Sequence, residues 1–277
     1  MEIIKTIADM KQFAAAHRAE GIGFVPTMGA LHEGHLSLIE RSVRENPVTV
    51  VSVFVNPVQF CPGEDYEAYP RTLDADAALA ADAGAAAVFA PSAQEMYPEG
   101  YHTYVETGGI TDVLCGKSRP GHFRGVTTVL TKLFHLVQPQ RAYFGQKDAQ
   151  QLLVVQKMVR ELHFDLEIVG CPIVREADGL AKSSRNQYLS ADERRRAVVL
   201  SRSLDWVKAQ VDAGAVNVAE LLNGMHERIT AEGGDVEYIE YVSRETLLPL
   251  ETVQPNSMFA LAVRFGTTRL IDNLFVD

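Results

Sequence analysis

The sequence contains little cysteine, and its cysteines are not arranged to pair. Only three occur among the 277 residues, at Cys61, Cys115 and Cys171. They are odd in number, widely separated and form no Cys-x-x-Cys pair, so the sequence supports neither a disulfide framework nor a cysteine zinc site. A reducing compartment suits such a chain, and we expect the protein to be cytoplasmic.

Basic residues are scarce relative to acidic ones. The chain has 26 Lys and Arg against 36 Asp and Glu, which gives a formal net charge of −10. This charge removes the general attraction that duplex nucleic acid or an anionic membrane would need, so we expect neither as a partner. An anionic substrate must therefore be held by a local basic site.

Long apolar runs are also missing. The N-terminal segment contains the acidic residues Glu2 and Asp9 and lacks the apolar core of a signal peptide. No uninterrupted apolar run approaches the roughly 18–20 residues of a membrane span, and we expect neither export nor membrane insertion. With 47% hydrophobic and 22% charged residues, the composition is instead that of a globular protein that can bury a sizeable core.

Apolar strands alternate with helix-length segments over the first two thirds of the chain. The run 48–55 is nearly all β-branched or aromatic, which is typical of a strand buried on both faces of a parallel sheet. A helix-length segment at about 34–45 separates it from the apolar run 24–25, which makes a βαβ unit. Further expected strands are 86–89, 141–144 and 166–169, and expected helices are 6–20, 72–83, 125–137 and 148–162. This order predicts an α/β fold with a Rossmann-like, doubly wound parallel sheet.

The pattern changes after about residue 175. Ser190 and Glu193 form a capping box that opens a predicted helix through Trp206 to about Val211. We expect a second helix near 217–231, strands at 236–242 and 257–264, and a last strand after the turn 265–267. The sequence therefore predicts two domains, residues 1–175 and a smaller α+β domain at 176–277.

The most informative segment is Pro-Thr-Met-Gly-Ala-Leu-His-Glu-Gly-His at 26–35, between the first core strand and the next helix. Ligands bind at this position in open α/β sheets. A helix N-terminus offers unpaired backbone N–H groups and a partial positive charge, and His32 and His35 can reach one phosphate from the same face. Gly29 and Gly34 let a nucleotide lie against the backbone. The segment predicts a nucleotide phosphate site, with a turn carrying two surface histidines as the alternative.

Three other interpretations of the motifs fit less well. His32 and His35 stand three residues apart rather than the four of a His-Glu-x-x-His zinc site, with no evident third ligand. The tail 116–118 resembles a P-loop, but the required first glycine falls on Thr111. Gly21 and Gly23 could begin the G-x-G-x-x-G fingerprint of a dinucleotide site, but Pro26 stands at the position of its third glycine.

Two further polar clusters could bind phosphate. Where a strand meets a helix, Lys147 could neutralise a phosphate, and Asp148 could cap the helix or accept from a ribose hydroxyl. The segment 182–186 supplies two hydroxyls and two cations, which suits a polyphosphate. Taken alone, the first cluster could be only a capped helix start and the second only a solvated loop.

Neutral amides lie at the expected carboxyl end of the long apolar strand. Asn56 and Gln59 follow that strand, and Pro57 should end it. Amides there can recognise hydroxyl and carboxylate groups of a small substrate, and Gln151 should point inward one turn into its helix. A hydrogen-bonded strand end is the alternative interpretation.

The segment 115–125 combines glycine and proline with four basic or potentially basic side chains. Such a loop could act as a mobile lid over a site.

Six ordered segments resemble the pantothenate synthetase family, the pantoate–β-alanine ligases of the nucleotidylyltransferase superfamily. The first carries the His-x-Gly-His loop of that superfamily, and the resemblance covers essentially the whole chain. The matching segments are 26–35, 54–60, 119–126, 144–148, 183–186 and 237–242. Six matches in order are far more specific than any one alone.

The resemblance implies a set of ligand-binding positions. ATP would lie along Met28, Gly29, Ala30, Leu31, His32, Glu33, Gly34, His35, Gly145, Gln146, Lys147, Asp148, Val174, Lys182, Ser183, Ser184 and Arg185. Gln59 and Gln151 would hold pantoate, and Gln59 would also adjoin β-alanine. His35 would be the proton donor. The resemblance also implies a cytoplasmic homodimer that needs Mg²⁺ with ATP, without identifying metal ligands.

The implied reaction joins (R)-pantoate to β-alanine to give pantothenate, a precursor of coenzyme A. A carboxylate is a poor acyl donor, so its oxygen would first attack the α-phosphate of ATP, giving pantoyl adenylate and pyrophosphate. The amine would then displace AMP. His32, His35, Lys147 and Arg185 would stabilise charge developing on the phosphates.

The sequence departs from the family pattern at three positions. Gln146 stands where the family often has Glu, Lys182 where it often has Met, and Cys61 where Gly is common. The histidines, Lys147 and both pantoate glutamines are unchanged, so the departures bear on affinity more than on activity. Because a long lysine can extend into solvent, we expect residue 182 to contact ATP through its backbone.

Three alternatives from other classes stay open. Another nucleotidylyltransferase would share the first loop but should lack the Gln59 and Gln151 pair and the C-terminal domain. An aminoacyl-tRNA synthetase remnant would need a basic anticodon-reading surface, which a charge of −10 disfavours. A non-catalytic nucleotide-binding module would not need to retain every phosphate-binding candidate.

Overall fold

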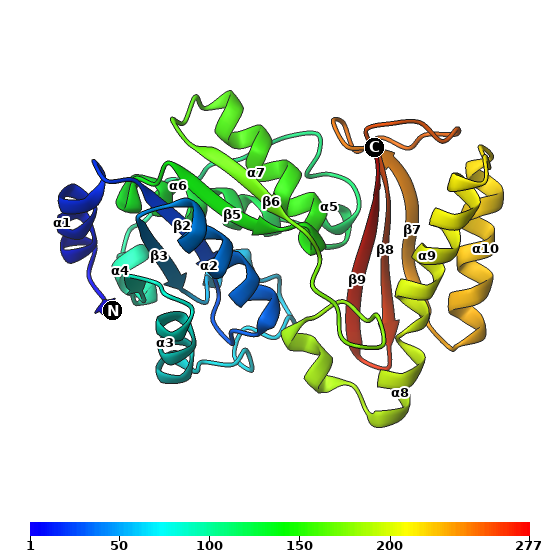
Figure 1. Cartoon of the computed structure of the whole chain (residues 1–277), viewed down its shortest axis with the longest axis horizontal. Helices are drawn as coiled ribbons and strands as arrows, with labels where there is room; N and C mark the ends of the chain where they lie inside the picture. Colours follow the sequence, from blue (N-terminus) through cyan, green and yellow to red (C-terminus); the bar gives the residue numbers. More distant parts are fainter. The chain divides into compact units, whose positions relative to one another are not determined.

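The computed structural model describes all 277 residues, and the chain forms two compact units (Figure 1). Unit 1 comprises Met1–Thr111, Cys115–Gln146 and Gln150–Pro172. Unit 2 comprises Asp112–Leu114, Lys147–Ala149 and Ile173–Asp277. None of the helices combines the length and the apolar character needed to cross a membrane.

Unit 1 is built on six parallel strands in the order β1-β4-β3-β2-β5-β6. The strands are β1 Glu2–Ile4, β2 Ile22–Thr27, β3 Val48–Val53, β4 Ala87–Phe89, β5 Arg141–Gly145 and β6 Glu167–Cys171. The predicted α/β fold with a doubly wound parallel sheet is confirmed. The edge strand β1 was not predicted, because three residues are too few for a periodic pattern to appear.

Helices cover both faces of this sheet. The helices before β6 are α1 Ile7–His17, α2 Glu33–Glu45, α3 Leu73–Asp82, α4 Ala93–Met96, α5 Cys115–Ser118, α6 His122–Val137 and α7 Ala149–Glu161, with short 3-10 turns η1 Pro57–Gln59 and η2 Gln146–Asp148. Successive side chains of a strand point to opposite faces. Val25 of β2 accordingly lies in one core cluster with Leu38 and Ile39 of α2, while Phe24 packs edge-on against Phe134 of α6, with ring centroids 6.3 Å apart.

The order of the sheet reverses between β2 and β5. From β2 the chain moves outward through β3 and β4, then returns to the other side of β2 at β5, with β6 beyond it. Open α/β sheets bind ligands beyond the carboxyl ends of the strands at such a reversal. The segments that leave these two strands begin at Met28 and Gln146, inside two of the predicted phosphate-binding segments.

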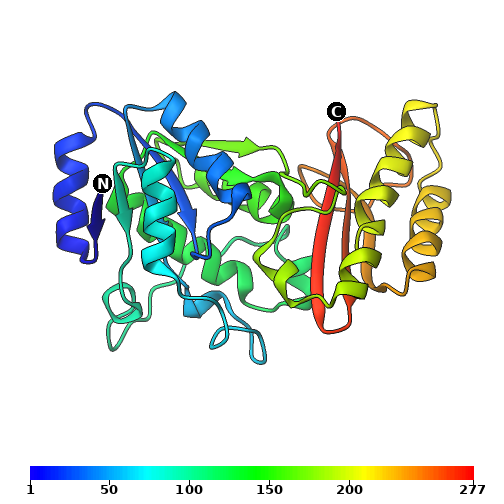
Figure 2. The ribbon, with the colours of Figure 1, turned by 60° about the horizontal axis from the view of Figure 1, so that its bottom comes forward.

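Unit 2 is a three-stranded antiparallel sheet with two helices packed along it (Figure 2). Its elements are η3 Ser184–Tyr188, α8 Ala191–Arg196, α9 Val199–Asp212, α10 Val218–Ala231, β7 Asp235–Ser243, β8 Ser257–Phe265 and β9 Thr268–Val276. Leu204 of α9, Met225 of α10 and Phe259 of β8 are buried in its core. The expected α+β character of this region is therefore observed.

The predicted single helix from Ser190 to about Val211 is wrong, because the structure has two helices, α8 and α9. The capping box of Ser190 and Glu193 is present and opens the first. The break is at Ala197 and Val198, within a run of four buried residues, Ala197–Leu200. Ala197 and Val198 keep right-handed helical dihedral angles, but the Leu200 N–H donates to the carbonyl of Ala197, three residues back, so the helix tightens into a turn at this point.

The expected lid segment 115–125 is not an open loop. It contains α5, a turn at 119–121 and the start of α6, and Gly121 takes a left-handed φ of 85° at the turn. Gly116 lies so close to Thr111 that a side chain would collide with the Thr111 carbonyl oxygen. The glycines in this segment therefore serve tight packing and a turn between helices, which the sequence alone does not distinguish from a flexible loop.

Candidate active site

The two histidines of the predicted phosphate site cap the helix that they open. The N–H of Gly34 donates to Nδ1 of His32 at 3.1 Å, and the N–H of His32 donates to Nδ1 of His35 at 3.3 Å. The rings lie 4.1 Å apart between centroids. Because Nδ1 is an acceptor in both rings, the proton of each neutral imidazole lies on Nε2. Nε2–H is therefore the ring group that can donate to a phosphate.

The backbone N–H groups around these histidines are bonded within the protein. Gly29 donates to the Thr27 hydroxyl, Ala30 and Leu31 donate to the carboxylate of Asp76, and His35 and Leu36 donate to the His32 carbonyl. The expectation that this helix start offers unpaired N–H groups to a phosphate is wrong for these residues. The sequence marks a helix start but does not reveal that two ring nitrogens and a carboxylate 45 residues away occupy its donors. A phosphate bound here would therefore have to be neutralised mainly by side chains.

Gln59 lies on η1, where its side chain is held by its neighbours. Asn56, which is buried, donates from Nδ2 to Oε1 of Gln59 at 3.0 Å and to the Gly125 carbonyl at 3.1 Å. Nε2 of Gln59 lies 3.0 Å from Sδ of Met28. Two predicted site residues, Met28 and Gln59, are therefore in contact, and Asn56 orients the amide.

A second set of contacts fixes the backbone of Gln59, and sequence reasoning missed it. The Gln59 carbonyl lies 2.8 Å from Nδ1 of the buried His122, and Nε2 of His122 lies 3.0 Å from Nη1 of Arg119. Arg119 can only donate, so Nε2 of His122 accepts and its Nδ1–H donates to Gln59. Arg119 in turn pairs with Glu64 through two hydrogen bonds. These partners are more than 50 residues apart in sequence, so no local pattern connects them.

The pKa of Glu64 reflects this pair. Burial raises the pKa of the carboxyl, but the Arg119 guanidinium and the backbone N–H of Cys61 lower it, and the net shift is downward. Glu64 therefore favours its charged form, as expected for a partly buried partner of an arginine.

Gln151 lies in the first turn of α7 and is half-buried. The buried amide of this turn is its neighbour Gln150, which accepts from the Cys115 N–H and donates to the Ile110 carbonyl, each at 2.9 Å. Gln150 therefore anchors α7 to the segment before α5. The more accessible Gln151 stays the candidate for substrate contact.

Lys147 and Asp148 belong to unit 2. Their side chains form an ion pair at 3.6 Å, and Asp148 lies in the 3-10 turn that precedes α7. The Lys147 carbonyl accepts from Nδ2 of Asn273, a buried residue of β9, at 3.0 Å. Sequence reasoning missed Asn273, because it is 126 positions from Lys147.

The neighbouring residue of β9 holds another part of unit 2. The buried Asp272 accepts from Nη1 and Nη2 of Arg175 at 2.6 and 3.0 Å. Burial alone would lower the pKa of Arg175, but the hydrogen bond and charge of Asp272 raise it. Asp272 and Asn273 thus fix the chain beside Val174 and at Lys147.

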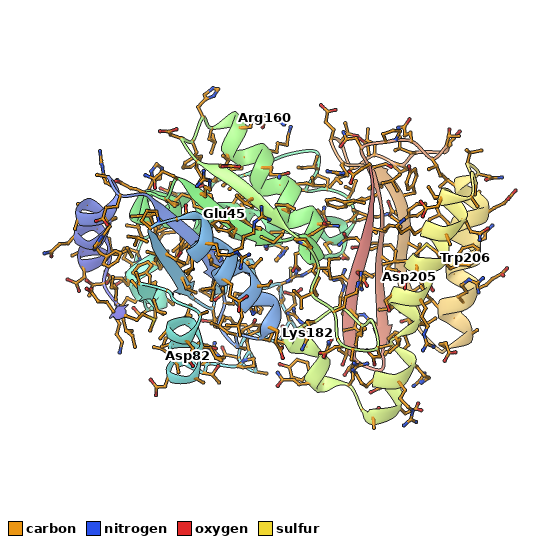
Figure 3. The ribbon with its side chains drawn as sticks, viewed as in Figure 1. Glu45, Asp82, Arg160, Lys182, Asp205 and Trp206 are labelled. Carbon is orange, nitrogen blue, oxygen red and sulfur yellow. The ribbon has the colours of Figure 1, made fainter.

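Within unit 2, residue 182 is bonded to residue 174. The Lys182 N–H donates to the Val174 carbonyl at 2.9 Å, and Ser183 accepts the Arg185 N–H at its hydroxyl, so the segment is an ordered turn. The expectation that the Lys182 side chain, labelled in Figure 3, extends into solvent is wrong. Its Nζ pairs with Glu176 at 3.2 Å, and the side chain is only 17% exposed. Glu176, six residues before Lys182 in the sequence, holds the ammonium group and so keeps the side chain out of solvent.

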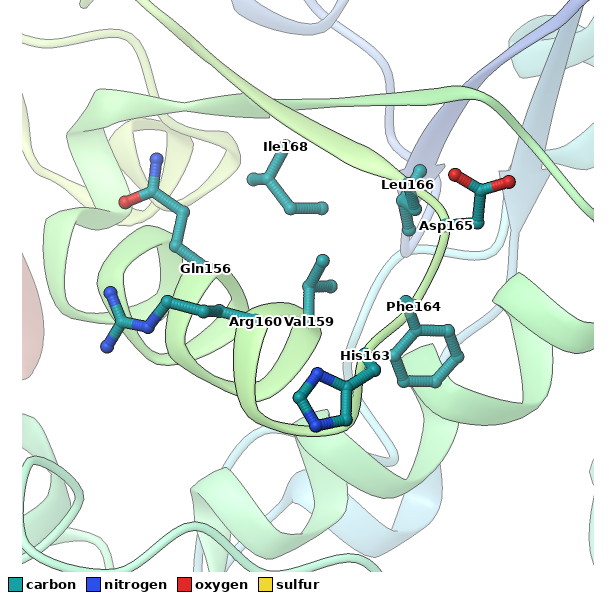
Figure 4. Close-up of a pocket in the computed structure, with 8 residues that line it drawn as sticks. All are labelled: Gln156, Val159, Arg160, His163, Phe164, Asp165, Leu166 and Ile168. Atoms are coloured by element: carbon teal, nitrogen blue, oxygen red, sulfur yellow. The ribbon is translucent and has the colours of Figure 1, made fainter.

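One hollow in unit 1 is separate from all of these residues (Figure 4). It measures about 550 Å³ and is lined by Gln156, Val159, Arg160, His163, Phe164, Asp165, Leu166 and Ile168. It lies where α7 ends and β6 begins, whereas the carboxyl ends of the strands carry the predicted site. The protein has no group of three or more His, Cys, Asp or Glu side chains placed to hold a metal ion, which does not support the zinc interpretation.

A doubly wound parallel sheet with a His-x-Gly-His loop at its reversal defines an α/β nucleotide-binding protein of the nucleotidylyltransferase type. The sequence model of one family of this kind, described as pantoate-beta-alanine ligase, matches residues 2–275. The chain belongs to this family, and it is an enzyme, a ligase.

Several relatives match over the full length. Pantothenate synthetase from Acetivibrio thermocellus is 53% identical, with 100% of both chains covered. The solved pantothenate synthetase from Thermus thermophilus is 52% identical, covers 99% of each chain and superposes with a TM-score of 0.94. The solved pantoate-beta-alanine ligase from Francisella tularensis, complexed with beta-gamma ATP and beta-alanine, is 36% identical with a TM-score of 0.83, covering 99% of this chain and 97% of that one.

Proposed function

We propose that this enzyme condenses (R)-pantoate with β-alanine to form pantothenate, a precursor of coenzyme A, using ATP and passing through a pantoyl adenylate. Membership of the ligase family supports the overall reaction, and the relative from Francisella tularensis was solved with beta-gamma ATP and beta-alanine. The observation that carries the adenylate step is the pair of Nδ1-capped histidines after β2. The two Nε2–H groups would then donate to the phosphates of a nucleotide bound at the position where such sheets bind nucleotides.

ATP is proposed to contact seventeen residues, of which four stabilise charge on its phosphates. Those four are His32, His35, Lys147 and Arg185, and His35 is the proton donor. The remaining contacts are Met28, Gly29, Ala30, Leu31, Glu33, Gly34, Gly145, Gln146, Asp148, Val174, Lys182, Ser183 and Ser184. Since the N–H groups of Ala30 and Leu31 donate to the Asp76 carboxylate, other atoms of these two residues would contact ATP.

Pantoate is proposed to bind Gln59 and Gln151, with β-alanine next to Gln59. Neutral amides can hydrogen-bond to hydroxyl and carboxylate groups, and because they carry no charge they do not attract the triphosphate of ATP to the pantoate site. The network around Gln59 supports this role, because Asn56 orients its side chain and His122 holds its backbone. Binding energy of this kind lowers the barrier by fixing the carboxylate in line with the α-phosphate.

In the first chemical step, a carboxylate oxygen of pantoate attacks the α-phosphorus of ATP, and the bond to the bridging oxygen of pyrophosphate breaks. The amine of β-alanine then attacks the acyl carbon, and AMP leaves with the bond electrons while the amine loses a proton. Donors from histidine, lysine and arginine would stabilise the extra negative charge on the phosphates as the first bond breaks.

Mg²⁺ is proposed to accompany ATP. Mg²⁺ is usually held by phosphate oxygens, water and one or two carboxylates rather than by an all-protein cage. The donor set of this chain, with no acidic or histidine cluster of three, fits an ion of that kind. Such an ion would neutralise phosphate charge.

The setting of the enzyme is also a proposal. We propose that it works in the cytoplasm as a homodimer, with no nucleic acid or membrane partner. Residues 1–175 are proposed as the ATP- and pantoate-binding domain and residues 176–277 as a smaller C-terminal domain.

The proposal is tested by timing pyrophosphate release. Enzyme mixed with Mg²⁺, ATP and pantoate should release about one equivalent of pyrophosphate per active site and then stop. Adding β-alanine should start continuous release together with AMP and pantothenate. A reaction without pantoate is the control and should release none. Absence of any pyrophosphate before the amine is added would contradict the adenylate step.

A further inference from the structure

A buried carboxylate is hydrogen-bonded to the turn at residues 29–31, which precedes the two histidines. Asp76, on α3, is 1% exposed. Its Oδ1 accepts the Leu31 N–H at 2.8 Å, and its Oδ2 accepts the Ala30 N–H at 3.1 Å and the Thr72 hydroxyl at 3.2 Å. A buried carboxylate is costly unless it is hydrogen-bonded, so these donors are needed to keep it there.

The turn that Asp76 holds has an unusual backbone. Gly29 and Ala30 are consecutive residues with left-handed φ angles of 87° and 51°. Alanine rarely adopts this conformation, which persists when the surroundings enforce it. At Gly29 a side chain would meet Oδ2 of Asp76 at 2.9 Å and Val53 at 3.0 Å, so the carboxylate also fills the space that only glycine leaves open.

The turn determines where the imidazoles lie. Leu31, whose N–H is bound by Asp76, is followed directly by His32, the cap of α2. The His32 N–H is also the donor to His35, so one short stretch of backbone links the carboxylate to both rings.

We propose that Asp76 is a positioning residue for the adenylation step, holding the 29–31 turn so that His32 and His35 form their reciprocal cap with Nε2–H toward the phosphates. This inference rests on the proposed function for its kinetic consequence, while the tautomers of the two rings can be observed independently. Nothing requires Asp76 to touch a substrate.

The test is Asp76→Asn, with Asp74→Asn as the matched control. Asparagine has the same shape but replaces one acceptor oxygen with an NH₂ group, so one of the two backbone N–H groups would face a donor. Asp74 lies on the same helical turn and is exposed, so its substitution removes the same charge without touching the turn. Two readouts are needed, because a loss of activity alone could come from misfolding.

The first readout is pantoate-dependent exchange of labelled pyrophosphate into ATP. We expect Asp76→Asn to slow exchange by about 10–100-fold, with most of the loss in kcat rather than in the KM for pantoate, while Asp74→Asn stays within about twofold. The second readout is ¹⁵N NMR of the histidine rings. Wild type and Asp74→Asn should show Nε2-protonated signals for His32 and His35, and Asp76→Asn should show those signals shifted or averaged between tautomers.

Thr72→Val provides a second variant if Asp76→Asn does not fold. It removes only the hydroxyl donor to Asp76 and should slow exchange by about two- to fivefold with smaller changes in the same two ring signals. Ring signals and exchange unchanged from the Asp74→Asn control, in whichever of these variants folds, would overturn the proposal. Failure of wild type to catalyse exchange would instead reject the proposed adenylation, and the ring signals would still decide whether Asp76 positions the histidines.

Discussion

Each histidine of the His-x-Gly-His loop uses its two ring nitrogens differently. Nδ1 accepts a backbone N–H and closes the start of α2, and Nε2 is the ring nitrogen that we propose faces the ligand. A single substitution should therefore change both the rate and the stability. Lys147, in contrast, has its carbonyl held by Asn273, so its side chain can be removed without breaking that contact.

Replacing His35 by Ala should lower the rate of adenylate formation by roughly 10²–10³-fold, about 3–4 kcal/mol, because a donor to the developing charge is lost. It should also lower the free energy of unfolding by about 1 kcal/mol, since the His32 N–H loses its acceptor. Lys147→Ala should give a similar rate loss. Rapid-quench pyrophosphate release and urea unfolding measure the two effects. His17→Ala, on α1, is the control, and loss of folding rather than of rate would return both residues to a structural role.

The two glutamines should act on pantoate and not on ATP. Ala at Gln59 or Gln151 should weaken pantoate binding by about tenfold, roughly 1.4 kcal/mol, because a neutral amide contributes a hydrogen bond to a hydroxyl or carboxylate. The affinity for ATP should stay within about twofold. Calorimetric titration with each ligand tests this, with Gln156→Ala, further along α7, as the control. A variant that loses ATP binding and keeps pantoate binding would reject the assignment.

Lys182 and Arg185 lie in the same turn but should differ in importance. Lys182 is already paired with Glu176, so we expect Lys182→Met to leave the KM for ATP within about threefold, under ~1 kcal/mol. Arg185→Ala removes a planar set of donors and should raise that KM or lower kcat by about tenfold or more. Steady-state kinetics with varied ATP compare the two. Equal losses would show that Lys182 leaves Glu176 to bind the triphosphate.

Among the elements, η1 and the start of α6 depend on each other through side chains. Glu64, Arg119 and His122 connect the segment after η1 to the backbone of Gln59, and Gly125 packs so closely that a side chain would meet the Gln59 Cα at 2.5 Å. The proposed pantoate residue therefore lies on a short turn that gains its rigidity from a helix distant in sequence.

This connection should be sensitive to acid. The pKa of Glu64 is lower in the folded protein than its usual 4.5, because the hydrogen bonds from Arg119 and Cys61 outweigh burial, which acts in the opposite direction. Its contribution to stability is then fully present above the unfolded pKa and is lost as the pH falls through the folded one. Glu64→Gln should cost about 1–3 kcal/mol at pH 7, and its difference from wild type should shrink below pH 4.5.

Urea unfolding at pH 7 and at pH 4 or below measures this difference, with Glu67→Gln, in the same segment, as the control. A stability difference that stayed constant across this range would mean that the ion pair contributes nothing that depends on the charge of Glu64.

For the molecule as a whole, the order of the main elements and the position of the His-x-Gly-His loop were predictable, whereas the contacts that hold the loop were not. The run 48–55 and the histidine motif are local signals, read from periodicity and spacing. Several of the contacts join residues that are far apart in sequence, so they can be identified only from the folded structure. They are the hydrogen bonds of Asp76, of Asn273, and of Glu64 with Arg119. The break between α8 and α9 was also not predictable, because the backbone tightens there through one hydrogen bond, from Leu200 to Ala197, that the pattern of apolar residues does not show.

The net charge of −10 makes the local basic groups decisive for a substrate as anionic as ATP. They are the histidine pair, Lys147 and Arg185 among the proposed residues, and their effect is expected on the step in which pyrophosphate leaves. The proposed mechanism therefore requires that pyrophosphate leaves before the amine enters.

Isotope exchange tests that claim most directly. Enzyme incubated with Mg²⁺, ATP, pantoate and labelled pyrophosphate, and with no β-alanine, should transfer label into ATP, and omitting pantoate should abolish the transfer. This result would mean that pantoate and ATP form the adenylate and pyrophosphate reversibly on their own. Exchange that appears only when β-alanine is present would contradict the adenylate mechanism.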